Sequence, residues 1–169
     1  VNAEALYPYE IVAKVCPRYS RYRGFQEIPE TDRAMINKYW ENLPDYLNGA
    51  DNNILCVVDT SGSMTSTYGS SVKPIDVAIS LGLYCAERNR GAFANHYISF
   101  ASKPRLIATN GYDFVDKVQR IYKTNLVDNT NLEAVFDLLL NMITSGRAKA
   151  EDLPSTIVVI SDMQIDSAT

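Results

Sequence analysis

The stretch that determines the fold is "ILCVVDTSGSMTS", residues 54–66. Five apolar residues precede Asp59, and Ser61 and Ser63 follow it on either side of Gly62. An unbroken apolar run of this length is typical of a strand that is covered on both faces in a parallel sheet. The predicted strand therefore ends in three oxygen-bearing side chains, and Gly62 allows the tight turn that directs both serines toward one point.

Strands and helices are predicted to alternate through the rest of the chain. Apolar runs predict strands, and apolar residues at helical spacing predict helices. The expected strands are 53–59, 96–102, 105–109 and 155–162, and the expected helices are 73–89, 112–123 and 131–143. The apolar stripe of the last helix is expected to be Leu132, Val135, Phe136, Leu139 and Ile143. This alternation predicts an α/β fold with three layers, in which a mostly parallel, doubly wound sheet carries helices on both faces.

Residues 1–52 are interpreted as a helical N-terminal extension or linker, and residues 53–169 as the main domain. A short helix is expected after Pro8, because proline is tolerated at a helix start. A second helix is expected with Thr31 as its cap, ending or kinking at Pro44. The turn residues 48–53 mark the boundary.

Composition restricts the classes of function. The 169 residues carry a net charge of −4, which gives no general attraction to nucleic acid or to anionic membranes. No apolar run approaches the roughly 20 residues that cross a bilayer, so no membrane association is expected. The three cysteines, Cys16, Cys56 and Cys85, are odd in number and lack metal-type spacing. They favour a reducing, cytoplasmic (intracellular) location.

A second strand ends in an aspartate at the same predicted edge. The run 155–162 ends in Asp162, and parallel strands bring their carboxyl ends to one edge of the sheet. The loop 124–131 should reach this edge as well, and it contains Thr130. These segments gather an oxygen-only set of candidate metal ligands, namely Asp59, Ser61, Ser63, Thr130 and Asp162. Such ligands favour Mg²⁺, Mn²⁺ or Ca²⁺ over zinc or copper. The single histidine, His96, is expected to be structural.

The segment "DTSGSM" resembles the metal-ion-dependent adhesion site of von Willebrand factor A domains. That motif is D-x-S-x-S, then a distant threonine, then a distant aspartate, and the resemblance covers residues 53–166. The runs "PIDVAISLGLYCAERN", "NTNLEAVFDLLL" and "VVISDMQID" are similar to a group of bacterial, viral and eukaryotic proteins of unknown function. The A domain of that group is similar to that of Ro autoantigen-like (TROVE-type) proteins, in which a helical region precedes it. "LYPYEIVAKV" resembles the end of that helical region.

The resemblance implies a non-enzymatic, metal-dependent module for protein–protein interaction. In such domains the two serines, here Ser61 and Ser63, usually ligate the metal directly. The threonine, here Thr130, ligates it directly or through water, and the aspartates, here Asp59 and Asp162, often act through water. One coordination position stays open, and a glutamate or aspartate of the partner commonly fills it.

The chain departs from the family pattern at two places. Leu126, Val127 and Asp128 replace the small residues expected before the threonine. Asp128 either adds negative charge near the metal, which would weaken capture of an acidic partner or favour Ca²⁺, or points away and caps the helix at 131. An A domain also continues beyond the strand that ends in Asp162, so truncation at the C-terminus is expected. The sheet edge exposed in this way favours self-association.

Two other functions remain open from the sequence. An RNA-associated role is suggested by the interleaved cations and aromatics Arg18, Tyr19, Arg21, Tyr22 and Arg23, which suit phosphate contacts and base stacking. In Ro-like proteins, however, RNA is bound chiefly by a helical ring that is mostly absent here. The third hypothesis is that the protein is a metal-dependent hydrolase. No general base is evident, so no catalytic residue is assigned and the protein is not expected to be an enzyme.

Overall fold

A four-stranded, mostly parallel sheet forms the centre of the molecule. The computed structural model describes residues 6–16, 24–48, 53–67, 69–124 and 131–162. The strands of the sheet lie in the order β3-β2-β1-β4 and are β1 (Ile54–Asp59), β2 (His96–Phe100), β3 (Arg105–Ala108) and β4 (Thr156–Ile160). Strand β1 pairs in parallel with both β2 and β4, whereas β2 and β3 are antiparallel. All four strands predicted from the sequence are therefore confirmed.

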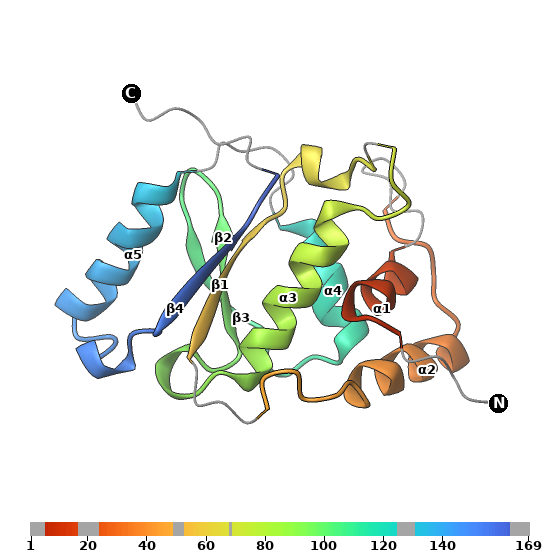
Figure 1. Ribbon diagram of the computed structural model, residues 1–169, viewed down its shortest axis with the longest axis horizontal. Helices are drawn as coiled ribbons and strands as arrows, with labels where there is room; N and C mark the ends of the chain where they lie inside the picture. The colour runs from red at the N-terminus through yellow and green to blue at the C-terminus, as the bar shows by residue number, and fades with distance from the viewer. Residues whose placement is uncertain (1–5, 17–23, 49–52, 68, 125–130, 163–169) are drawn as a thin grey trace.

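Helices cover both faces of this sheet and complete the three layers (Figure 1). Helices α3 (Pro74–Arg88) and α4 (Phe114–Lys123) cover one face, and α5 (Leu132–Thr144) covers the other. Helices α1 (Pro8–Val15) and α2 (Glu30–Glu41) pack against α3 and α4 on the side away from the sheet. Three single 3₁₀ turns complete the described elements, namely η1 (Gly62–Thr65), η2 (Gly91–Phe93) and η3 (Ala150–Asp152). This confirms the predicted α/β class, with helices on both faces.

Strand β1 owes its central place to side chains that are apolar on both faces. Cys56 and Val58 point into the core beneath α3, whereas Leu55 and Val57 point into the core beneath α5. Helix α3 lies close to this strand because it carries Gly82 there. A Cβ atom at position 82 would lie 2.6 Å from Cγ2 of Val58, so any larger residue would force the two elements apart.

Helices α1 and α2 share the core of the main domain. Ile11 and Val12 of α1 are fully buried, and α1 packs on α3. In α2, the ring of Trp40 stacks on Phe114 with 4.3 Å between ring centroids, and its indole N–H donates to Glu87 at 2.9 Å. The described part of the N-terminal segment is thus packed into the same hydrophobic core as α3 and α4.

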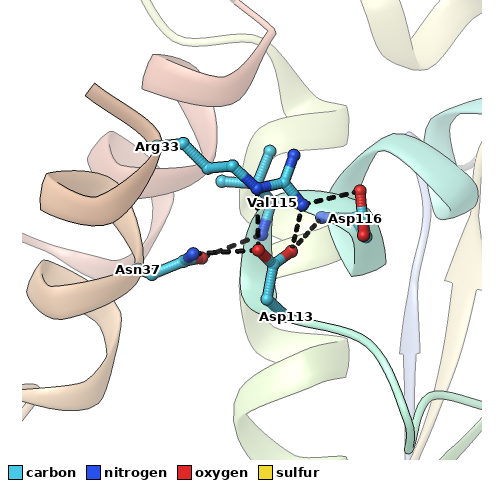
Figure 2. A network of polar contacts seen from close by, with 5 residues as sticks. All are labelled: Arg33, Asn37, Asp113, Val115 and Asp116. Carbon is cyan, nitrogen blue, oxygen red and sulfur yellow. Dashed lines mark hydrogen bonds and ion pairs between the residues drawn. The ribbon is translucent and has the colours of Figure 1, made fainter. Parts of the chain in front are cut away.

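A polar network joins α2 to the start of α4 (Figure 2). Asp113 is the N-cap of α4, where its Oδ1 accepts the backbone N–H of Asp116 at 2.8 Å. Arg33 donates two hydrogen bonds to the Asp113 carboxylate, at 2.8 and 2.7 Å, and also pairs with Asp116 at 2.8 Å. Asn37 donates to Asp113 at 3.0 Å and accepts from the backbone N–H of Val115 at 3.2 Å. The network satisfies free N–H groups at the start of α4.

This network is expected to make stability sensitive to acid. Partial burial raises the pKa of Asp113, but hydrogen bonds from Asp116, Asn37 and Arg33 outweigh that effect and lower it overall. A lowered pKa in the folded state means that the contribution is fully present above the unfolded-state value, about 3.9, and is lost as the pH falls through the folded-state pKa. Urea denaturation of the wild type and of Asp113→Asn between pH 7 and pH 2.5 should show a stability difference that shrinks on acidification.

The Arg33→Gln variant provides a check on the same network. The contribution of Arg33 to the free energy of unfolding also requires an ionised Asp113. Its stability difference from the wild type should shrink over the same pH range. A difference that stays constant from pH 7 to pH 2.5 in both variants would contradict the assignment of this network.

The structure corrects two details of the sequence prediction. Helix α2 begins at Glu30, so Thr31 lies inside its first turn and is not the cap; Pro29 occupies the cap position, and Glu30 and Asp32 interact favourably with the helix dipole. Helix α5 is capped by Asn131, whose side chain accepts the backbone N–H of Ala134 at 3.1 Å; Asp128, for which a capping role is one of two predictions, lies outside the described residues.

The second correction concerns the apolar stripe of α5. Its buried residues are Val135, Leu139 and Met142, whereas Leu132 and Phe136 are 37% and 54% exposed. Helix α5 contacts the sheet along one line of side chains, so the apolar residues that lie further around the helix face away from the core.

Strand β4 is the last strand of the described sheet on this side, and its residue Val159 is 37% exposed. Self-association through this edge stays a prediction.

The three cysteines are unpaired thiols in the structure. Cys16 and Cys56 are buried, Cys85 is half-buried, and none of the three forms a disulfide. Burial raises the pKa of the Cys16 thiol, which keeps it protonated. Among the described residues, no helix has both the length and the apolar character needed to cross a membrane.

Candidate functional site

The ends of β1 and β4 bring the predicted site together at the carboxyl edge of the sheet. Because Val58 pairs in parallel register with Ile160, the residues that follow each strand lie side by side. The hydroxyl of Ser161 donates to Oδ2 of Asp59 at 2.7 Å, and Asp162 is the next residue. Asp59 and Asp162 therefore leave adjacent strands at the same edge, as the sequence predicts.

The turn after β1 brings its two serines into contact. Oδ1 of Asp59 accepts the backbone N–H of Ser61 at 2.8 Å, which is an Asx-type turn. The hydroxyl oxygens of Ser61 and Ser63 then lie 3.1 Å apart. Met64, which is 1% exposed, holds the turn against the core. The predicted convergence of these side chains is present in the structure.

Asp59 is a buried carboxylate held by neutral donors. It is 1% exposed, and its two oxygens accept from the Ser61 N–H and the Ser161 hydroxyl. No lysine, arginine or histidine forms an ion pair with it in the described part of the chain. A charge buried at this position without a counter-charge would be costly, and a bound cation would offset that cost.

The other residues singled out from the sequence either lie outside the described residues or, like His96, lie away from this edge of the sheet. Thr130 and Asp128 lie outside the described residues, as do Arg18, Tyr19, Arg21, Tyr22 and Arg23. The last described residue before Thr130 is Thr124, whose carbonyl oxygen accepts the hydroxyl of Thr60 beside Asp59. His96 is at the amino end of β2, the opposite edge of the sheet, with its Nδ1 2.6 Å from the carbonyl oxygen of Ala94. It takes no part in this edge.

The donors at this edge suit a hard divalent cation. They are carboxylate and hydroxyl oxygens, which are the ligands that Mg²⁺, Mn²⁺ and Ca²⁺ prefer. Within the ranges that the structure describes, no three histidine, cysteine, aspartate or glutamate side chains form a cluster able to hold a metal. A cation bound at this edge would therefore have to be held by the serine hydroxyls as well as the two aspartates.

Sequence reasoning missed Ser161. Ser161 belongs to the candidate site because its hydroxyl donates a hydrogen bond to the second carboxylate oxygen of Asp59. The available signal was the parallel register of the two apolar runs, which places the residue before Asp162 directly beside Asp59. Motif matching overlooks this position because the motif specifies only Asp162.

Together, the fold and this edge define an α/β protein with an oxygen-rich turn at the carboxyl ends of a mostly parallel sheet. Residues 53–169 match the family model described as a domain of unknown function (DUF7788), and the chain belongs to that family. Helices α1 and α2 precede the matched region.

One relative extends the comparison to nearly the whole chain. The chain is 30% identical over 166 residues to the uncharacterised protein L728 of Acanthamoeba polyphaga mimivirus. The match covers 98% of this chain and 26% of the relative, so the chain spans about a quarter of the relative's length. No solved structure matches the chain. Neither name states an activity or a ligand.

Proposed function

We propose that this protein is a non-enzymatic binding module of the von Willebrand factor A type, which recognises a protein partner through a divalent metal. The observation that carries the proposal is the convergence of buried Asp59 with Ser61 and Ser63 at the edge where Asp162 also emerges. This arrangement supplies the oxygen donors of a metal-ion-dependent adhesion site.

Each residue has a distinct role in the proposal. Ser61 and Ser63 hold the cation, and Asp59 and Asp162 balance its charge and orient its water ligands. Thr130 is proposed as the fifth member of the set. Mg²⁺, with Mn²⁺ or Ca²⁺ as alternatives, supplies a coordination position that a carboxylate oxygen of the partner completes.

The charges of the site explain why the metal would control binding. Asp59 and Asp162 repel an acidic partner by themselves, and the whole chain carries a net charge of −4. A bound divalent cation neutralises these two carboxylates and offers an open coordination position, so that a glutamate or aspartate of the partner can bind only when the metal is present.

The location proposed with this function is the cytoplasm. Three free cysteines support it, because thiols of this kind persist unpaired in reducing compartments.

The function is tested with a pair of short peptides that differ at one position. Acetyl-Gly-Glu-Gly-amide is titrated in Mg²⁺ and in EDTA while the backbone amides of Ser61, Gly62 and Ser63 are followed by NMR, and acetyl-Gly-Gln-Gly-amide, which has no carboxylate, serves as the matched control. The glutamate peptide should shift these amides only in Mg²⁺, and the glutamine peptide should leave them unchanged. Equal shifts in EDTA, or equal shifts with both peptides, would contradict the proposal.

A further inference from the structure

A second candidate site lies between the sheet and α4. A cavity of about 430 Å³ is lined by residues of β2, β3, the following loop and α4. Its lining includes four cations and no carboxylate, and the cations are Arg105, Lys117, Arg120 and Lys123. In a chain of net charge −4, this concentration of positive charge favours an anionic ligand.

Three of the four cations form no ion pair with a carboxylate in the described parts of the chain, and two of these three are arginines. Lys117 pairs with Glu87 at 2.8 Å, and the ammonium of Lys123 lies 5.2 Å from the centroid of the Phe25 ring. Arg105 and Arg120 are exposed, and neither pairs with a carboxylate in the described parts of the chain. Two guanidinium groups without acidic partners suit a phosphate, which arginine binds through two parallel hydrogen bonds.

The hydroxyl of Tyr97 is an independent indication of a ligand. Tyr97 lines the cavity and is 1% exposed, and its hydroxyl has no hydrogen-bond partner among the described residues. The neighbouring hydroxyl of Thr124 donates instead to the carbonyl of Ile121, at 2.7 Å. Buried hydroxyl groups are normally paired, so this donor in the wall of a basic cavity is suited to an acceptor oxygen.

The surroundings of the Tyr97 hydroxyl also favour its role as a hydrogen-bond donor. Burial raises the pKa of Tyr97 above its usual value, and the neighbouring Thr124 side chain together with the charges of Arg105 and Arg120 reduces the rise without cancelling it. The hydroxyl thus stays protonated at neutral pH and remains a donor. Tyr97, Arg105 and Arg120 all line the same cavity.

The other lining residues are suited to a flat ring. Tyr112 is 42% exposed, and the guanidinium of Arg120 lies 4.0 Å from its ring centroid. Ile107 and Ile121 add apolar surface to the same cavity. Aromatic side chains of this kind stack on nucleobases without requiring a particular base.

We propose that this cavity binds a nucleoside 5′-monophosphate, with its phosphate held by Arg105, Arg120 and the Tyr97 hydroxyl and its base packed against Tyr112. The cavity volume lies within the range of small-molecule sites. Its lining shares no residue with the metal set at the carboxyl edge, and the proposal does not depend on a metal.

The test is calorimetric titration of the full chain with AMP, GMP, CMP and UMP, in EDTA so that no phosphate binds through a divalent metal. At least one nucleotide should bind, and Arg105→Gln and Arg120→Gln should each raise its Kd by about ten- to a hundredfold. Arg147→Gln is the matched control, because this exposed arginine follows α5 on the other side of the sheet. It should leave the Kd unchanged.

Further measurements separate the roles of phosphate, base and hydroxyl. The matching nucleoside should not bind, and inorganic phosphate should bind more weakly than the nucleotide. Tyr97→Phe should weaken binding while keeping the melting temperature of the free protein, since it removes only an unpaired hydroxyl. The proposal is overturned if none of the four nucleotides binds at millimolar concentration, if both arginine variants bind like the wild type, or if phosphate alone binds as tightly as the nucleotide.

Discussion

Replacing Trp40 by alanine is expected to lower the free energy of unfolding by about 3–5 kcal/mol, the usual cost of truncating a large buried aromatic residue. Trp40 is 6% exposed and is held by Phe114, Tyr84 and Glu87, which belong to α4 and α3. The substitution leaves a cavity between three helices and removes a hydrogen-bond donor from Glu87. Urea denaturation followed by circular dichroism measures the effect. Fluorescence is unsuitable because Trp40 is the only tryptophan.

Two further variants isolate the cause. Met35→Ala changes another large side chain of α2, but Met35 is 46% exposed, so the expected loss is within about 0.5 kcal/mol. Trp40→Phe keeps much of the stacking on Phe114 and removes the indole N–H, so its cost should lie between the other two. Losses of equal size for Met35→Ala and Trp40→Ala would show that α2 is not packed as described.

The hydrophobic core of the family domain includes residues that precede the matched region. The matched family region begins at residue 53, yet α1 and α2, which precede it, bury Ile11, Val12 and Trp40 in the core of α3 and α4. The stability of the family domain in this chain therefore depends on residues outside the family match.

Much of the fold is predictable because each strand and helix has a strong local pattern. The apolar run before Asp59 is continuous because both faces of β1 are buried, and the alternation of strands and helices then restricts the topology. Thr31 and Phe136 were misassigned for a different reason. A helix boundary and the buried half of an apolar stripe depend on tertiary packing, which a single sequence does not specify.

In the candidate sites, too, some features follow from the local sequence and others only from the folded structure. The approach of Asp59, Ser61 and Ser63 is local in sequence, and the contribution of the strand ending in Asp162 follows from parallel topology. The cavity with Arg105 and Arg120 had no sequence signal. Its residues come from separate elements, and the buried, unpaired hydroxyl of Tyr97 is a property of the folded chain alone.

The second large effect is expected at the proposed metal site. Asp59→Asn keeps the shape of the side chain and removes its charge, so the affinity for Mn²⁺ or Mg²⁺ should fall about a hundredfold, at the upper end of the losses found when supporting residues of metal sites are changed. The double variant Ser61→Ala/Ser63→Ala removes the two hydroxyl donors and should abolish binding. Asp137→Asn is the matched control, because it removes the same charge from an exposed position on α5.

The most direct measurement is the titration of Mn²⁺ into the metal-free protein, with free Mn²⁺ followed by electron paramagnetic resonance. We expect one site in the wild type and in Asp137→Asn, a site with about a hundredfold lower affinity in Asp59→Asn, and no site in Ser61→Ala/Ser63→Ala. Absence of Mn²⁺ binding by the wild type at millimolar metal, or equal binding by all four proteins, would contradict it.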